Sequence, residues 1–227
     1  MVRFPSSVGG PNWGPLSYNP QLGYVFISLH NTGSYSAGKR AGGAAGARGA
    51  AATGAPAGGG APPAGGRRGG GQGGGGGGRS QFEQFAYPLP SGKTAPCYAP
   101  PYGALVAVDV NTGDIAWTST LGINENLAEL GDVGLKTGTR NLGGSIATAG
   151  GLVFIGATND HRFRAFDAKT GKELWVAELP ASGHSTPMTY MGKDGAQYVV
   201  IAASGGTSVG NGLQISDQLV AFKLGGQ

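Results

Sequence analysis

The feature that most constrains the fold is a short motif that occurs twice. Residues 104–117 and 162–175 both place Ala, Asp, Gly and Trp in the register A-x-D-x-x-x-G-x-x-x-W, 58 residues apart. Each copy reads as strand, tight turn, strand, with Gly at the position where a turn needs positive φ. A third, broken copy at residues 219–223 keeps the strand but has Lys223 in place of Asp. A repeat of this period predicts a propeller or a solenoid array.

The repeated positions are interpreted as structural, because residues that recur in every repeat serve the fold. They are Ala107, Asp109, Gly113 and Trp117 in the first copy, and Ala165, Asp167, Gly171 and Trp175 in the second.

The remaining pattern consists of short apolar runs between turn signals. Residues 145–179 read as four strands with short turns, which makes one complete antiparallel blade. A weakly helical piece is expected only around residues 125–130. Because one blade cannot bury its own faces, it must stack on neighbours. We therefore expect an all-β partial β-propeller of about three four-stranded antiparallel blades, belonging to a larger ring.

One segment does not fit this pattern. Residues 37–80 contain 20 Gly and 12 Ala with no acidic and no aromatic residue, too little apolar surface to offset the backbone entropy of folding. The sequence predicts a disordered Gly/Ala/Arg-rich insertion here. The expected division is 1–36 as the first part of a blade, 37–80 as the insertion and 81–227 as the C-terminal blades.

The insertion also explains the basic charge. It holds six of the sixteen Lys and Arg residues, so the rest of the chain has ten basic and twelve acidic residues, a net charge of −2. The pI near 9.3 therefore does not describe a basic face. A nucleic-acid role for residues 67–70 is the weaker alternative to a solvated linker, because interleaved aromatic residues are missing.

Several other classes of site are disfavoured. The single cysteine, Cys97, excludes an internal disulfide and a Cys-based zinc site, and we interpret it as an inert thiol. The three histidines, His30, His161 and His184, lack the spacing of metal ligands and are interpreted as polar loop residues. No apolar run approaches the roughly 18 residues of a membrane span. No signal peptide is recognised, so an export signal is expected upstream of Met1, which suggests a fragment.

The repeat resembles the tryptophan-docking motif of quinoprotein propellers, in which each Trp docks on the neighbouring blade. The connecting sequences are more specific: residues 138–160, 186–190 and 197–203 resemble, in order, the C-terminal region of pyrroloquinoline quinone (PQQ) dehydrogenases of the membrane glucose dehydrogenase type. Residues 10–18 resemble the Asn-Trp loop of the same enzymes. The resemblance covers nearly everything outside residues 37–80.

The resemblance implies an eight-bladed propeller with PQQ at its axis beside a Ca²⁺ or Mg²⁺ ion. An Asp base would take the proton of an aldose or alcohol while hydride passes to PQQ, and electrons would continue to a membrane quinone in the periplasm. The base and the metal ligands are expected in upstream blades, so no catalytic and no metal residue is assigned here. Expected partners are a sugar or alcohol substrate, the membrane quinone and the upstream blades, without nucleic acid.

The resemblance also assigns cofactor-binding candidates. Asn12 is a polar contact, since an amide both donates and accepts, although fixing its own turn is an open alternative. Trp13 is a second candidate, with loop packing as the favoured alternative. Asn141, Leu142 and Gly143 lie where related alcohol dehydrogenases place a Trp against the cofactor ring. Leu142 would supply an apolar wall, and Gly143 would allow close backbone approach.

Two further positions concern the same enzymes. Asp160 matches an acid that the membrane glucose dehydrogenases place near the electron-accepting quinone, and capping of backbone N–H groups explains it almost as well. Residues 205–207 read Gly-Gly-Thr where many relatives have Gly-Gly-His, so any role of that His is lost.

The predicted function is the C-terminal portion of a PQQ-dependent dehydrogenase. The alternatives are a cofactor-free propeller that serves as an interaction scaffold, and an inactive fragment. Residues 10–18 and 141–144 favour the dehydrogenase, because a scaffold has no need of axis-facing residues of these types. The isolated chain is expected neither to bind PQQ tightly nor to oxidise glucose.

Overall fold

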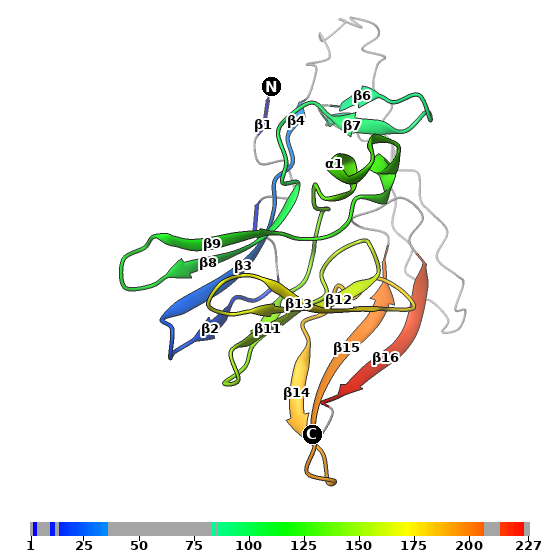
Figure 1. Ribbon diagram of the computed structural model, residues 1–227. Helices are drawn as coiled ribbons and strands as arrows, with labels where there is room; N and C mark the ends of the chain where they lie inside the picture. The colour runs from blue at the N-terminus through cyan, green and yellow to red at the C-terminus, as the bar shows by residue number, and fades with distance from the viewer. Residues whose placement is uncertain are drawn as a thin grey trace, which may run out of the picture.

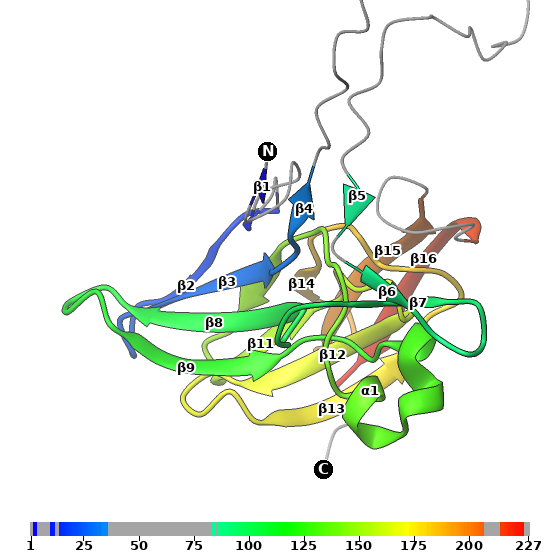
Figure 2. The same cartoon turned by 90° about the horizontal axis from the view of Figure 1, so that it is seen from above.

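The computed structural model describes residues 2–3, 10–11, 14–35, 83–84, 86–206 and 214–224. Within them, three antiparallel sheets follow one another in chain order and stack face to face (Figure 1, Figure 2). The predicted all-β partial propeller of about three blades is confirmed. The insertion predicted at residues 37–80 lies outside the described residues.

The first sheet joins strands from both sides of residues 37–80. Its strands, in sheet order, are β2 (Ser17–Asn19), β3 (Tyr24–His30), β8 (Gly103–Asp109) and β9 (Ile115–Thr120). β3 and β8 pair along their full length, from Tyr24 opposite Asp109 to His30 opposite Gly103. The connection of residues 31–102 therefore begins and ends at the same end of this strand pair.

The second sheet is the complete blade predicted for residues 145–179. Its strands, in sheet order, are β10 (Ser145–Ala147), β11 (Leu152–Ile155), β12 (Arg162–Asp167) and β13 (Glu173–Glu178). The third sheet has three described strands, which are β14 (Met188–Met191), β15 (Gln197–Gly205) and β16 (Ile215–Lys223).

Several smaller elements lie outside these three sheets. They are the sheet of β1 (Val2–Arg3), β4 (Ser34–Tyr35) and β5 (Glu83–Gln84), the pair β6 (Ala86–Pro88) and β7 (Thr94–Pro96), the 3₁₀ helix η1 (Glu125–Leu130) and α1 (Asp132–Leu135). The weakly helical piece predicted around residues 125–130 is η1. Among the described residues there is no helix with the length and apolar character that crossing a membrane would need.

Apolar side chains fill the two spaces between successive sheets. Phe26 and Leu105 of the first sheet pack with Phe166 of the second, and all three are buried. On the other face of the second sheet, Phe163 packs with Ile201 of the third sheet. Burial of an apolar side chain of this size stabilises the fold by about 1.5–3 kcal/mol. The inner strands β11 and β12 of the second sheet are thus buried on both faces, which explains their apolar residues at successive positions.

The repeated Asp closes its own turn in both copies. Asp109 Oδ1 accepts the backbone N–H of Asn111 at 2.9 Å, and Asp167 Oδ1 accepts that of Thr170 at 2.7 Å. The glycine of each turn has positive φ, 80° at Gly113 and 72° at Gly171.

The repeated Trp behaves differently in the two copies. Trp117 Nε1 donates to the Ala168 carbonyl oxygen at 3.0 Å, and its ring lies so close to Gly171 that a Cβ there would collide with it. Trp117 therefore docks on the turn of the next sheet. Trp175 packs edge-on against Phe222 of the third sheet and is 37% exposed.

The antiparallel order gives the sheets two ends of different character. We call one the turn end, where connections are short: residues 20–23, 110–114, 148–151, 168–172 and 192–196. We call the other the loop end, which carries the connections 31–102, 121–144, 156–161, 179–187 and 206–214. Most candidate site residues lie at the loop end.

Candidate functional site

Two segments that are far apart in the sequence meet at the loop end. A Cβ on Gly14 would collide with the carbonyl carbon and oxygen of Gly143, and a Cβ on Gly144 would lie 2.5 Å from Pro15 Cδ. Beside them, the hydroxyls of Ser17 and Ser145 are 2.6 Å apart. The structure therefore brings the two predicted cofactor segments, residues 10–18 and 141–143, into backbone contact, which only glycine permits.

Asn12 and Trp13 lie outside the described residues, so their assignments stay predictions. The described residues on either side are anchored. The backbone N–H of His30 donates to the Gly10 carbonyl oxygen at 3.2 Å, and Gly14 packs on Gly143. The residues that flank Asn12 and Trp13 are thus in contact with β3 on one side and with the 138–144 connection on the other.

Asn141 joins three segments and is 2% exposed. Its Nδ2 donates to the carbonyl oxygens of Leu29 at 2.7 Å and Thr139 at 3.3 Å, and its backbone bridges to Thr158. Both amide protons of the side chain are therefore engaged in fixing the connection to β3. This geometry gives Asn141 a positioning role, and its predicted contact with the cofactor stays a prediction.

His30 corrects the interpretation as a polar loop residue. It is the last residue of β3, it is 1% exposed, and its Nδ1 lies 3.1 Å from the Asn141 carbonyl oxygen. Since a carbonyl oxygen only accepts, Nδ1 carries the proton. His30 therefore holds the backbone of Asn141 to the end of β3 through this hydrogen bond.

His184 is a site residue that the sequence analysis missed. It is 8% exposed, and its Nδ1 lies 3.2 Å from the Leu142 carbonyl oxygen and 3.1 Å from that of Ala157. Two carbonyl partners require a protonated Nδ1. Burial lowers the pKa of His184 despite these two hydrogen bonds, so the ring is neutral near pH 7 and Nε2 carries a lone pair. Nε2 is buried and has no hydrogen-bond partner among the residues that the structure describes.

The backbone around His184 is under local constraint. Ala157, which accepts its hydrogen bond, has φ of 63°, an uncommon value for a residue with a Cβ. Gly143 has φ of 127°, and a Cβ there would lie 2.6 Å from the His184 carbonyl oxygen. This close approach is to the protein's own backbone, and the predicted approach of Gly143 to the cofactor stays a prediction. Leu142, predicted as an apolar wall, is 7% exposed and donates its N–H to Ala157 O at 2.8 Å.

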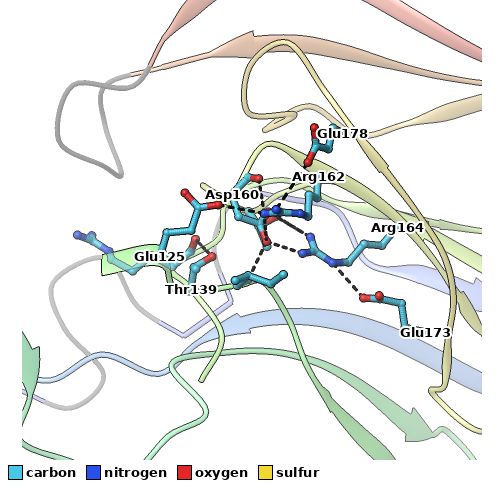
Figure 3. Close-up of polar contacts among 10 residues, drawn as sticks. Glu125, Thr139, Asp160, Arg162, Arg164, Glu173 and Glu178 are labelled. Atoms are coloured by element: carbon cyan, nitrogen blue, oxygen red, sulfur yellow. Dashed lines mark hydrogen bonds and ion pairs between the residues drawn. The ribbon is translucent and has the colours of Figure 1, made fainter. Parts of the chain in front are cut away.

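Asp160 is the centre of a buried polar network (Figure 3). Its carboxylate, with no exposed surface, accepts hydrogen bonds from Thr158 Oγ1 at 2.6 Å, the Ile123 N–H at 2.7 Å and the guanidinium of Arg164. Burial alone would raise the pKa of Asp160, but the Arg164 pairing, with Thr158 and Ile123, holds it below its ordinary value. Asp160 therefore ties the 121–144 connection to the second sheet.

The rim of this network is more exposed. Arg162 Nη1 lies 3.3 Å from Glu125 Oε1, and Arg164 Nε lies 3.0 Å from Glu173 Oε2 (Figure 3). The Arg162–Glu125 pair is partly exposed, and exposed ion pairs contribute about 0–1 kcal/mol. Both oxygens of Asp160 are occupied inside the network, and one partner is the backbone N–H of Ile123. Its predicted place near the quinone acceptor stays a prediction.

The other candidate positions complete the loop end. Gly205 has φ of 66°, and a Cβ there would collide with the Gln214 carbonyl oxygen. A Cβ on Gly206 would lie 4.0 Å from His184 Cδ2, and Thr207 is outside the described residues. Cys97 is an exposed free thiol. No group of three or more His, Cys, Asp or Glu residues suited to a metal ion occurs in the described ranges.

Comparison with known proteins gives consistent matches. Residues 1–199 match the family described as PQQ, glucose/ethanol/alcohol dehydrogenase, β-propeller domain. The chain is 35% identical over 208 residues to quinate/shikimate dehydrogenase (quinone) of Acinetobacter baylyi, covering 90% of this chain and 24% of that protein. It is 45% identical over 131 residues to quinoprotein glucose dehydrogenase A of Acinetobacter calcoaceticus, covering 57% of this chain and 16% of that protein.

Among solved structures, a europium-containing methanol dehydrogenase aligns with a TM-score of 0.50 and 22% identity, over 90% of this chain and 27% of that one. This likeness shows the fold alone. The chain spans about a quarter or less of the length of the two curated relatives.

Proposed function

Because this chain belongs to the PQQ-dependent glucose/ethanol/alcohol dehydrogenase family of β-propellers, we propose that it forms part of the cofactor site of such a dehydrogenase. The reaction is oxidation of an aldose or alcohol hydroxyl, with PQQ as the immediate acceptor and a membrane quinone as the next one. The proposed location is the periplasm, where such a quinone can be reached from the aqueous side of the membrane.

The observation that carries this proposal is the contact between Gly14 and Gly143 at the loop end. Two segments that resemble cofactor loops, but lie on different sides of the 37–80 segment, are brought together there. A scaffold propeller does not need these two loops to meet, because contacts such as that of Trp117 with the next turn already join its repeats.

The residues present fit PQQ in their chemistry. PQQ, when bound, supplies the two-electron acceptor for a hydroxyl-bearing carbon. His184 Nε2 is a buried acceptor without a partner among the described residues. Leu142, which directly precedes Gly143 in the sequence, is an apolar residue beside it. A buried nitrogen without a partner costs free energy, and such a cost is typical of a site that is completed by a ligand.

The chain's own residues would bind and orient. Asn141 fixes the 138–144 connection against β3, and neutral His184 holds the Leu142 and Ala157 carbonyls together. In this tautomer, Nε2 can accept a hydrogen bond and can hold a proton only after its ring becomes cationic, which burial disfavours. We therefore assign His184 a role in orientation, and no proton-transfer step.

A Ca²⁺ or Mg²⁺ ion is the expected companion of the cofactor, and hard cations take clustered carboxylate oxygens. The described residues do not provide such a cluster at the loop end, where Asp160 is occupied by Arg164. We propose that the ion's ligands, like the catalytic base, come from other parts of a longer dehydrogenase.

The test is a dye-linked assay on the natural protein that contains this chain, with glucose, ethanol, glycerol and quinate as substrates. We expect turnover that depends on added PQQ and divalent cation. The substitution His184→Gln, which retains a side-chain hydrogen-bond acceptor, should weaken PQQ binding about tenfold, while His161→Gln serves as the matched control. A properly folded protein that neither binds PQQ nor reduces the dye would instead support the scaffold alternative.

A further inference from the structure

A single imidazole ring joins three connections of the loop end. His184, in the 179–187 connection, has its Nδ1 3.2 Å from the carbonyl oxygen of Leu142 and 3.1 Å from that of Ala157. The backbone closes the same contact, because the Leu142 N–H donates to Ala157 O at 2.8 Å and the Ala157 N–H donates to Gly183 O at 2.7 Å. We call these four residues the loop junction.

The loop junction suits only one protonation state of the ring. Because both partners of Nδ1 are carbonyl oxygens, Nδ1 carries the proton, and a second proton has to bind at Nε2. His184 is 8% exposed, and its Nε2 has no hydrogen-bond partner among the described residues. A second proton therefore creates a buried positive charge and a buried N–H group without an acceptor, which costs free energy for as long as the ring stays in the junction.

The charged groups on the neighbouring elements do not compensate such a charge. Burial, and after it the charge of His161, lowers the pKa of His184. Asp160 has both oxygens engaged in its own network, and Arg140 has the same sign as an imidazolium. Residues 203–207, which include Gly206 beside the ring, contain no ionisable side chain. Outside the described residues the sequence has no Asp or Glu that could serve instead.

We propose that His184 makes the loop junction acid-sensitive: the junction is closed while the ring is neutral and opens when the ring takes up a second proton. Opening releases Leu142 and Gly143 from the 179–187 connection and weakens the backbone contact between Gly143 and Gly14. The two segments of the candidate site therefore separate in acid. Only the consequence for cofactor binding rests on the proposed function, since the opening is a property of this chain's own residues.

The pH range follows from the direction of the shift. The folded-state pKa of His184 lies below its ordinary value of 6.5. The stabilisation is therefore fully present above about pH 6.5 and is lost as the pH falls from there toward the folded-state pKa. Uptake of one proton changes the equilibrium by at most about tenfold per pH unit. This range lies well above the range in which Asp160 takes up its proton.

The test is amide hydrogen exchange of the full, unliganded chain at pH 7.5 and pH 5, followed by NMR. Exchange is expressed as protection factors, which remove the pH dependence of the intrinsic exchange rate. The amides of Leu142 and Ala157 report on the loop junction, and those of Gly113 and Gly171, which close turns, report on the turn end. Protection in the junction should fall about tenfold or more in acid, whereas protection at the turn end should not change.

Three variants separate titration from packing. His184→Asn places an amide nitrogen close to the position of Nδ1, with one proton for each carbonyl oxygen, and does not titrate in this range. It should keep the protection of Leu142 and Ala157 at both pH values. His184→Ala removes the donor and should lower this protection at both pH values. His161→Gln removes an ionisable ring outside the junction and should retain the fall in acid.

The ring signals of the three histidines, assigned with the His161→Gln and His184→Asn variants, give a second readout. Protonation of His184 should coincide with the loss of protection at Leu142 and Ala157. Protonation without that loss, constant protection down to pH 5, or an equal fall in His184→Asn would overturn the proposal. PQQ binding, measured at both pH values, tests the other level: no binding at either pH contradicts the proposed function and leaves the amide result as it stands.

Discussion

The two ends of the sheets are built by different kinds of contact. At the turn end, Asp109 and Asp167 each close a turn with backbone groups two or three residues away. At the loop end, hydrogen bonds join residues more than a hundred positions apart, such as Ser17 to Ser145 and Asn141 to Leu29. Local contacts shape each blade, whereas distant contacts assemble the candidate site.

This difference predicts where a substitution changes the stability of the chain most. A turn-end Asp is only partly buried and bonds within one turn, so its loss has a local effect. A loop-end residue is buried among several connections, so its loss leaves polar groups of other segments without partners. The stability of this chain should therefore be more sensitive to changes at the loop end than to the same changes at the turn end.

The largest expected effect comes from Asp160→Asn. This change removes the negative charge that faces buried Arg164 and should destabilise the chain by about 3 kcal/mol. The matched change Asp167→Asn keeps an acceptor in an exposed turn and should cost less than about 0.5 kcal/mol. Urea unfolding of the two variants measures both values. Equal destabilisation would contradict the distinction between the two ends.

The next effect comes from a matched pair of glycines with positive φ. Gly143→Ala introduces a Cβ 2.6 Å from the His184 carbonyl oxygen, whereas a Cβ on Gly113 meets nothing within 4 Å. Backbone strain should cost about 1 kcal/mol at either position, and overpacking should add about 1 kcal/mol at Gly143 alone. Thermal unfolding should show the larger drop for Gly143→Ala, and a drop of equal size would place the site contact in doubt.

A smaller effect is expected from acid, since protonation removes the charge of Asp160 but leaves its volume and oxygens. The folded-state pKa of Asp160 lies below its ordinary value, so its contribution is fully present above the unfolded pKa near 3.9. The contribution is lost as the pH falls from that value through the folded pKa. Stability measured from pH 5 to pH 2 should fall more steeply for the unmodified chain than for Asp160→Asn. Parallel curves would mean that Asp160 carries no such linkage.

The smallest expected difference lies within the turn end, between the two Trp residues. Trp117→Phe leaves the Ala168 carbonyl without its indole donor and should cost about 1–2 kcal/mol. Trp175→Phe removes no hydrogen bond and keeps a ring against Phe222, so it should cost less than about 1 kcal/mol. Chemical unfolding followed by circular dichroism distinguishes them. A larger loss of stability for Trp175→Phe would show that docking of the Trp on the turn of the next sheet is not how the repeat stabilises the fold.

Much of the fold could be predicted because its signals are local. The A-x-D-x-x-x-G-x-x-x-W register places Asp, Gly and Trp within eleven residues, and the two strands of each copy, β8 with β9 and β12 with β13, pair across a short turn. The broken third copy agrees as well: Lys223 does not close a turn but pairs with Asp194 of the adjacent hairpin at 2.8 Å.

The candidate site could be predicted only in part. The segments 10–18 and 141–143 were identified by resemblance, but nothing in their spacing indicates that Gly14 touches Gly143. His30 and His184 gave no usable signal, because an isolated His reads the same whether it is exposed or buried. Their roles depend on which carbonyl, carboxylate or neighbour the fold places beside them.

The sequence by itself thus determined the blades, their turns and the family, since these depend on periodicity and on residues close along the chain. Only the tertiary structure decided that Asp160 pairs with Arg164, and that His184 is neutral with an Nε2 that has no hydrogen-bond partner among the described residues. The physical reason is that charge state and hydrogen bonding depend on burial and on contacts between distant segments, which stacking of the sheets creates.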